Sequence, residues 1–480
     1  MTRNAKIIAT IGPASSDLDR LRQLASAGMD IARLNFSHGD PEGHSQVIER
    51  IRKIADETGK AITVLQDLQG PKLRTGHLSV PEPIPLAPGH KLILRTTATQ
   101  GNADQIQVLY PTLTQDVEPG DRILLGDGRP ELRVGRVADG EVETQVVVAG
   151  NLTSHQGVCL PKPSLSASMP SEKDLSDLKF GLEHGVDAVA MSFVRRAKDV
   201  GDLKQAIHRL SPAEGVLPQV IAKLERAEAV QDLEAIIDEA DGVMVARGDL
   251  GLVLSAERVP SLQKRILRQA NLQRKSTITA TQMLESMVHN PRPTRAEASD
   301  VANAIFDGSD VVMLSAETAV GDYPVEAVET MGRIIEDAEA HIKEWGQPTD
   351  EPEGNATDDA LATSYAARAL ANDRSVKAIA VFTRSGTTAR LMSKTRPDVP
   401  IMGYTPDERT YRQLPLLWGV SPRFIPMAHS VEQMIEIVEL DLLRTKAAHP
   451  GDQVVLVASL PVGAAGPANF AYLHTLRSRS

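Results

Sequence analysis

Short apolar runs alternate with longer amphipathic segments along most of the chain. The first three runs, residues 6–12, 31–36 and 62–68, are rich in Ile, Val and Leu, and segments with helical spacing of Ala, Leu, Arg and Glu flank them. Such runs are typical of parallel strands that helices cover on both faces. After an interruption the pattern returns in five more runs, at 188–194, 219–225, 242–248, 276–283 and 311–317. Eight strand-helix units over roughly 250 residues predict a closed (β/α)8 TIM barrel.

The interruption between the third and fourth strands has a different pattern. From about residue 71 to 167, turn pairs such as Pro88-Gly89 and Pro119-Gly120 separate short runs of Val, Ile and Leu. This pattern predicts a small all-β domain. Because the insertion begins and ends in the loop after the third strand, we expect it to lie over the carboxyl ends of the strands as a movable lid. Pro71 and residues 168–170 are the candidate hinges.

The rest of the chain predicts a linker and a third domain. Residues 346–357 are acidic, rich in Pro and Gly, and without hydrophobic periodicity. Beyond them helical and strand patterns alternate again, which indicates an open α/β sheet. The predicted fold is therefore an α/β protein with four parts: a (β/α)8 barrel (1–70 and 168–345), an inserted all-β lid domain (71–167), a linker (346–357) and a C-terminal α/β domain (358–480).

Charge and composition exclude several classes of function. Lys and Arg total 52 against 63 Asp and Glu, so the net charge is −11, which disfavours sequence-blind binding of nucleic acid. No window approaches the roughly 18 consecutive apolar residues of a membrane helix. The single cysteine, Cys159, fits a reducing compartment. We therefore expect a cytoplasmic protein without nucleic-acid or membrane partners.

Polar residues end nearly every predicted barrel strand. At the carboxyl ends of barrel strands such residues indicate catalysis, because the rest of each strand must be apolar to fill the barrel. They are Arg33, Asn35 and Ser37 on the second strand, Asp67 on the third, Lys223 and Glu225 on the fifth, Gly248 and Asp249 after the sixth, Thr281 after the seventh, and Ser315 and Glu317 after the eighth.

Two of these residues are candidate metal ligands. Glu225 and Asp249, from adjacent strands, could hold a hard divalent cation that keeps positions for water and substrate oxygens, as Mg²⁺ prefers. Lys223 beside such a cation would stabilise negative charge on a transferring phosphoryl group or an enolate. The alternative is a purely structural salt bridge between Lys223 and Glu225.

Six longer stretches resemble the pyruvate kinase family. They are ARLNFSHG (32–39), LQDLQGPKLRTG (65–76), AKLERAEAV (222–230), VARGDLG (245–251), TATQMLESM (279–287) and MLSAETAVGDYP (313–324), and the resemblance extends over the whole chain. It implies phosphoryl transfer from phosphoenolpyruvate to ADP, giving pyruvate and ATP in the last step of glycolysis. It also implies a homotetramer.

The resemblance also implies roles for particular residues. Glu225 and Asp249 match ligands of Mg²⁺ or Mn²⁺, and Lys223 matches a lysine that faces the transferring phosphate. Arg33, Thr281 and the backbone at Gly248 and Asp249 match positions that hold the substrate. A threonine hydroxyl together with water is a reasonable relay for the proton that the enolate takes up. Nucleotide-side positions match Arg74, Lys173 and His38.

The monovalent-cation region departs from the common family pattern. Members that need K⁺ hold it with residues that match Asn35, Ser37, Asp67 and the carbonyl of Leu68, and they read D-T-K-G-P-E where this chain reads Asp67-Leu68-Gln69-Gly70-Pro71-Lys72. The ammonium of Lys72 could supply the positive charge of K⁺, and a tethered group loses less entropy than a free ion. The chain thus resembles the K⁺-independent branch, and K⁺ is predicted not to be required. The alternative is that Lys72 is a solvated hinge residue.

A loop in the third domain is a candidate effector site. Between a predicted strand and a predicted helix, the loop reads Thr383-Arg384-Ser385-Gly386-Thr387-Thr388. Its hydroxyl and N–H groups could hold a phosphate, although an ordinary N-capped turn would look similar. The family uses this loop for its effector, so the resemblance implies allosteric activation by a phosphorylated metabolite. Residues 461–476 lack the Trp- and Arg-bearing loop of members regulated by fructose bisphosphate, so a monophosphorylated sugar or nucleotide is expected.

Two other functions are compatible with parts of this pattern. A metal-dependent lyase or aldolase that makes pyruvate enolate on a TIM barrel would use the same two carboxylates, but it needs neither lid nor nucleotide-side cations. An inactive sensor of sugar phosphates would have lost its catalytic residues, whereas Lys223, Glu225, Asp249 and Thr281 are all present.

Overall fold

Eight parallel strands close into a barrel in the computed structural model, which describes residues 3–71, 73–161, 169–211, 215–346, 358–374, 376–463 and 466–477. The order around the barrel is β1-β16-β15-β14-β13-β12-β3-β2. Every apolar run predicted as a barrel strand forms one, so the predicted barrel is confirmed. The strands are β1 (Lys6–Ile11), β2 (Ile31–Asn35), β3 (Thr63–Leu68), β12 (Ala188–Met191), β13 (Gln219–Leu224), β14 (Gly242–Ala246), β15 (Ser276–Ala280) and β16 (Val311–Leu314).

Helices surround the barrel and bury its outer face. Apolar side chains such as Ile8, Ile31 and Leu65 fill the interior, while the alternate positions pack under the helices. Side-chain caps define where some of these helices begin. Thr294 and Glu297, for example, form a capping box at the N-terminus of the helix that starts at Arg295. The principal helices are α1 (Leu18–Ala27), α2 (Pro41–Thr58), α4 (Glu172–Glu183), α5 (Ala197–Leu210), α7 (Leu233–Glu239), α8 (Arg247–Leu254), α9 (Val259–Leu272), α10 (Arg295–Phe306) and α12 (Pro324–Ala340). No helix within the described ranges is long and apolar enough to cross a membrane.

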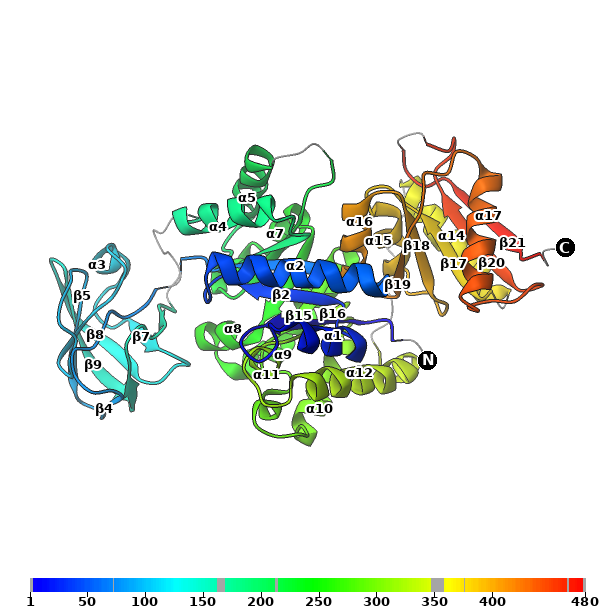
Figure 1. The fold of residues 1–480 in the computed structure, drawn as a ribbon. Helices are drawn as coiled ribbons and strands as arrows, with labels where there is room; N and C mark the ends of the chain where they lie inside the picture. Colours follow the sequence, from blue (N-terminus) through cyan, green and yellow to red (C-terminus); the bar gives the residue numbers. More distant parts are fainter. Residues whose placement is uncertain are drawn as a thin grey trace.

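The chain between β3 and α4 forms the predicted all-β insertion. Its six-stranded sheet has the order β11-β7-β8-β9-β5-β6, and a second sheet pairs β10 with β4. Side chains such as Leu92, Ile106 and Leu132 give it a core of its own. Figure 1 shows this domain at one end of the barrel. The strands are β4 (Ile84–Leu86), β5 (Lys91–Arg95), β6 (Gln105–Gln107), β7 (Arg122–Leu125), β8 (Glu131–Ala138), β9 (Glu141–Val148), β10 (Gly150–Leu152) and β11 (Val158–Cys159).

The C-terminal domain is an open α/β sheet at the opposite end of the barrel (Figure 1). Its strands have the order β19-β18-β17-β20-β21, and β21 alone is antiparallel to its neighbour. Sequence patterns missed the two edge strands and α16, because an edge strand such as β19 tolerates Pro422 and polar residues. The elements are α14 (Asp359–Asp373), β17 (Ala378–Phe382), α15 (Thr387–Lys394), β18 (Ile401–Thr405), α16 (Glu408–Gln413), β19 (Val420–Phe424), α17 (Val431–Arg444), β20 (Gln453–Ala458) and β21 (Phe470–Thr475). From residue 347 on, the predicted linker lies outside the described residues.

An aspartate stands directly before every second barrel strand, at the amino end of the barrel. Each carboxylate accepts a hydrogen bond of 2.8–2.9 Å from a backbone N–H of the preceding strand of the barrel. The four residues are Asp30, Asp187, Asp241 and Asp310. They tie neighbouring strands together and place four carboxylates around this end of the barrel.

Two of these aspartates join the barrel to the C-terminal domain. Arg412 Nε lies 2.9 Å from Asp187 Oδ1, and Lys394 Nζ lies 2.5 Å from Asp310 Oδ2. Arg396 also pairs with Asp310, at 2.6 Å. Both carboxylates are buried, so removal of one partner would leave an uncompensated charge in the interface. Ion pairs at the end of the barrel opposite to the predicted active site thus contribute to the contact with the C-terminal domain.

Candidate active site

Lys223, near the end of β13, is the centre of a buried polar cluster at the carboxyl end of the barrel. Its Nζ lies 3.0 Å from Glu225 Oε1 and 3.2 Å from Asp67 Oδ1, and it donates a 2.7 Å hydrogen bond to Ser192 Oγ. The four side chains come from β3, from β13 and from the chain directly after β12 and β13. The ammonium is thereby held at a fixed point between two carboxylates.

Arg33 on β2 extends the cluster. Its Nε donates to Asp67 Oδ2 at 2.7 Å, and its Nη1 donates to Thr10 Oγ1 at 3.0 Å. Burial by itself would raise the pKa of the Asp67 carboxyl, but the charges of Lys223 and Arg33 hold that pKa below its usual value. Asp67 is therefore an anion that positions two cations side by side.

Glu225 and Asp249 were predicted as metal ligands. Glu225 is fully buried and accepts a 2.8 Å hydrogen bond from the Phe193 N–H, whereas Asp249 lies exposed in the first turn of α8. Burial raises the pKa of the Glu225 carboxyl; Lys223 opposes this effect and the nearby Asp249 charge adds to it. Two mutually repelling carboxylates in a partly dry site suit a divalent cation, which would relieve the repulsion.

The two carboxylates of Glu225 and Asp249 suit Mg²⁺, which keeps water and substrate ligands, better than a metal that protein side chains coordinate by themselves. Among the described residues, no group of three or more His, Cys, Asp or Glu side chains could hold a metal ion. A pair of carboxylates that leaves positions for water and for substrate oxygens is the arrangement typical of Mg²⁺ sites in phosphoryl-transfer enzymes. The structural alternative, a salt bridge between Lys223 and Glu225, is also present at 3.0 Å, so the geometry is compatible with both readings.

Thr281 lies in a strained turn after β15. Thr281 and Gln282 have φ values of +69° and +54°, which non-glycine residues rarely adopt. The Thr281 hydroxyl accepts the Gly248 N–H at 2.8 Å and donates to the Ala280 carbonyl at 2.7 Å. This bond brings the turn after β15 against the start of α8, so Thr281, Gly248 and Asp249 form one side of the site.

Two residues to which sequence reasoning assigned no role organise this cluster. Ser192 contacts Lys223, Asp67 and the Leu68 carbonyl. Arg247 donates to the Thr281 carbonyl at 2.7 Å and pairs with Asp300, which holds the strained turn. Both signals were available, because Ser192 is a polar residue inside the fourth apolar run (188–194) and Arg247 directly precedes Gly248-Asp249.

Glu317, the last polar residue noted after the eighth strand, has a supporting position. Its buried carboxylate accepts the N–H groups of Leu284 at 3.0 Å and Ser315 at 2.6 Å. Burial raises the pKa of this carboxyl. Glu317 therefore fixes the loop after β15.

The predicted nucleotide-side residues lie in two parts of the molecule. Lys173, on α4, pairs with Asp177 and donates to the Phe36 carbonyl at 3.1 Å, which places it beside the loop after β2. The N–H of His38, in that loop, donates to the Asn35 carbonyl at 3.1 Å. Arg74 lies in the inserted domain, where it donates to the His155 carbonyl at 2.9 Å. The structure thus brings Lys173 close to the loop of His38 and leaves Arg74 on the β domain.

Protein donors contact several of the predicted monovalent-cation ligands. The Asn35 side chain accepts the Ser37 N–H at 3.1 Å. The Leu68 carbonyl accepts the Ser192 hydroxyl at 2.8 Å, and Asp67 binds Arg33 and Lys223. Lys72 lies outside the described residues.

The loop 383–388 connects β17 to α15, as predicted. Thr383 Oγ1 accepts the Gly386 N–H at 3.0 Å, and the hydroxyls of Ser385 and Thr387 lie 3.1 Å apart. Gly386 has φ +83°, a left-handed conformation that glycine adopts without strain. The loop lines a cavity of about 990 Å³ in the C-terminal domain, large enough for a phosphorylated metabolite.

The barrel holds a buried lysine between carboxylates at its carboxyl end, and a β domain is inserted after β3. The carboxyl end is where the active sites of TIM-barrel enzymes lie. Residues 2–328 match the barrel domain of pyruvate kinase, and residues 361–474 match its alpha/beta domain. The chain belongs to the pyruvate kinase family.

Known pyruvate kinases are similar to this chain over almost its whole length. That of Geobacillus stearothermophilus is 44% identical over 99% of this chain and 81% of its own length. That of Mycobacterium tuberculosis (strain ATCC 25618 / H37Rv) is 42% identical over 99% of both chains. The crystal structure of a pyruvate kinase from Cryptosporidium parvum superposes with a TM-score of 0.90 at 33% identity, covering 99% of this chain and 96% of that one.

The activity follows from the family. The enzyme is a phosphotransferase that moves the phosphoryl group of phosphoenolpyruvate to ADP, giving pyruvate and ATP. The lyase or aldolase hypothesis finds no support in these similarities. The fold class predicted from the sequence is confirmed as well.

Proposed function

We propose that the Lys223 cluster is the reaction centre of this pyruvate kinase. The observation that supports this assignment is the position of the Lys223 ammonium between Asp67, Glu225 and Ser192. There it can stabilise charge on the transferring phosphoryl group and on the enolate that remains. Arg33, Thr281 and the backbone at Gly248 and Asp249 hold phosphoenolpyruvate, and the Thr281 hydroxyl with water delivers the proton to the enolate.

The same proposal assigns the ligands around the substrate. Glu225 and Asp249 would hold Mg²⁺ or Mn²⁺, which supplies positive charge to the phosphoryl oxygens. Arg74, Lys173 and His38 contact the nucleotide. Pyruvate kinases generally use Mg²⁺ and K⁺. By its similarity to the family, the enzyme is proposed to act as a homotetramer in the cytoplasm.

ADP dependence tests the reaction directly. Pyruvate formation from phosphoenolpyruvate should require ADP and should release ATP in equal amount, because enolpyruvate leaves only when its phosphoryl group has an acceptor. Parallel assays of pyruvate and ATP measure the ratio. Pyruvate formed at the same rate without ADP would contradict the proposal and would favour a lyase or phosphatase.

Potassium is proposed to be unnecessary. Asp67 already binds two cationic side chains, and the Leu68 carbonyl already accepts Ser192, so two of the matched K⁺ ligands are engaged. The enzyme should keep near-full activity when tetramethylammonium replaces K⁺ at equal ionic strength. Lys72→Glu should create a K⁺ activation of about tenfold or more, because the local charge changes by two units.

The control for this prediction is Lys53→Glu, the same charge change on the exposed face of α2. It should leave the enzyme indifferent to K⁺. Strong K⁺ activation of the unmodified enzyme would refute the role given to Lys72.

The loop 383–388 is proposed to bind the phosphate of an allosteric activator, a monophosphorylated sugar or nucleotide. Its hydroxyls line the cavity of about 990 Å³. The double variant Thr383→Ala, Ser385→Ala should lose activation while it keeps the turnover of the unactivated enzyme, and Thr383→Ser, which keeps the hydroxyl, should retain activation. Activation curves with a panel of phosphorylated metabolites measure this effect, and an activator that still works on the double variant would exclude the loop.

A further inference from the structure

A row of four aromatic rings lies beside the loop that follows β2. His44, half-buried in the first turn of α2, stacks on Phe36 with ring centroids 4.2 Å apart and an angle of 15° between the ring planes. Phe36 packs in turn against Phe180 of α4, at 5.9 Å, and His184 stacks on Phe180 at 4.0 Å. The row thus joins the start of α2 to α4, the helix that carries Lys173.

The imidazole of His44 also holds the backbone of this loop. Its Nε2 lies 3.0 Å from the His38 carbonyl oxygen, and because a carbonyl only accepts, the ring carries a proton on Nε2 and donates it. A Cβ atom on Gly39, where φ is +78°, would lie 3.2 Å from this Nε2, so a side chain at that position would crowd the ring. His44 therefore contacts the loop in two ways, through its ring face and through its N–H.

His44 is a neutral donor near pH 7. Burial has the largest effect on its imidazole and lowers the pKa below the ordinary value. The hydrogen bond to the His38 carbonyl and the charges of Asp177 and Asp40 oppose this effect, whereas the charge of Lys173 adds to it. The neutral ring stacks on a phenyl group and leaves the positive charge beside the loop to Lys173.

Two side chains hold the loop from two different helices. Lys173 of α4 donates to the Phe36 carbonyl at 3.1 Å, and His44 of α2 donates to the His38 carbonyl two residues further on. Between these points the loop turns on a third bond, from the His38 N–H to the Asn35 carbonyl at 3.1 Å. His44 thus fixes the segment that carries His38 and that Lys173 contacts.

We propose that His44 is a positioning residue for the nucleotide, because its bond to the His38 carbonyl holds the loop so that His38 and Lys173 face ADP. This inference rests on the nucleotide contacts proposed above for these two residues and adds a residue that acts through them. Loss of the bond should weaken ADP binding, since the loop would no longer be preorganised. Binding of phosphoenolpyruvate, which is assigned to Arg33 and the Lys223 cluster, should not change.

Two variants of His44 separate the hydrogen bond from the ring stack. His44→Phe keeps an aromatic ring against Phe36 and removes the N–H, so the KM for ADP should rise about fivefold, the effect of one hydrogen bond. His44→Gln removes the ring, but its amide can place an N–H near the position of Nε2, so its KM for ADP should stay within about twofold of the unmodified value. Steady-state kinetics at saturating Mg²⁺ should show kcat and the KM for phosphoenolpyruvate unchanged in both variants.

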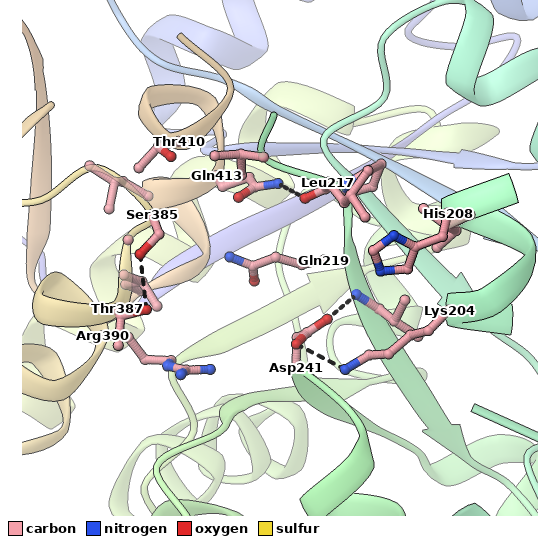
Figure 2. A pocket seen from close by; sticks show the side chains of 17 residues that line it. Lys204, His208, Leu217, Gln219, Asp241, Ser385, Thr387, Arg390, Thr410 and Gln413 are labelled. Atoms are coloured by element: carbon pink, nitrogen blue, oxygen red, sulfur yellow. Dashed lines mark hydrogen bonds and ion pairs between the residues drawn. The ribbon is translucent and has the colours of Figure 1, made fainter. Parts of the chain in front are cut away.

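His184→Phe is the matched control. His184 stacks on a phenyl ring of the same row, but its Nδ1 bonds to the Phe180 carbonyl of its own helix. This variant should leave all three constants unchanged. The hydroxyls of Ser385 and Thr387, which Figure 2 shows in contact, belong to the C-terminal domain at the opposite end of the barrel (Figure 1). The effect of His44→Phe should therefore be the same with and without an activator.

Three results would overturn the inference. The first is a KM for ADP in His44→Phe equal to that of the unmodified enzyme. The second is a raised KM for ADP in His44→Gln but not in His44→Phe, since the ring stack would then hold the loop. The third is an equal loss of kcat and of affinity for both substrates in His44→Phe, which would show a general structural role.

The nucleotide contacts themselves are tested with two other variants. His38→Ala removes the side chain and keeps the carbonyl that His44 binds, and Lys173→Gln removes the ammonium. At least one of them should raise the KM for ADP. If neither does, the proposed nucleotide role of these residues is wrong, whatever the His44 variants show.

Discussion

Replacement of Lys223 by Met is expected to lower kcat by roughly 10³-fold or more while the KM for phosphoenolpyruvate changes little. The ammonium lies at the mouth of the barrel between Asp67 and Glu225, where it can act on charge that develops during transfer. An interaction that is strongest in the transition state affects kcat rather than ground-state binding. Steady-state kinetics at saturating Mg²⁺ and ADP measure both constants.

The matched control is Lys394→Met at the other end of the barrel. Lys394 is also a buried lysine paired with a barrel carboxylate, Asp310. Each variant leaves a buried carboxylate short of one cation, so each should lose up to about 3–5 kcal/mol of stability. Only Lys223→Met should lose turnover. A higher KM with normal kcat would contradict the role of Lys223, and an equal loss of turnover in both variants would show a purely structural effect.

The barrel could be predicted because its strands are buried on both faces, so that each is a continuous apolar run with a polar end. Lys223 and Glu225 stood out because two charges two positions apart interrupt such a run. Their partners could not be predicted individually. Asp67 on β3 and Lys223 on β13 are separated in the barrel by β12, and side chains from alternate strands form one layer only when the barrel closes.

The four aspartates at the amino end of the barrel form a pattern that is visible in the sequence, but their role could not be predicted from it. An aspartate directly precedes the second, fourth, sixth and eighth barrel strands in the sequence. Its meaning depends on cations from distant parts of the chain, since Arg412 pairs with Asp187 and Lys394 with Asp310. Contacts between domains follow from docking geometry, which local hydrophobic and polar patterns do not encode. The edge strand β21 escaped prediction for the related reason that its pairing with β20, rather than its own pattern, stabilises it.

Glu225→Gln and Asp249→Asn are each expected to lower turnover by about 10²-fold or more at ordinary Mg²⁺ and to weaken binding of Mn²⁺ to the free enzyme. Each change removes one of the two negative charges that would hold the cation. Because Asp249 is exposed, its substitution should change stability by no more than about 0.5 kcal/mol. Titration of Mn²⁺ by electron paramagnetic resonance, without substrate, separates metal binding from catalysis.

Asp337→Asn, an exposed substitution of the same kind on α12, is the control and should leave Mn²⁺ affinity unchanged. The two readings of Glu225 diverge in this experiment. If Glu225 served only as the salt-bridge partner of Lys223, Glu225→Gln would lower stability and leave the Mn²⁺ affinity intact. If it is a metal ligand, the Mn²⁺ affinity falls in both variants, and excess Mg²⁺ restores part of the turnover of Asp249→Asn. Near-normal activity of Asp249→Asn at ordinary Mg²⁺ would reject the shared cation site, because one buried carboxylate already paired with a lysine cannot hold a divalent ion alone.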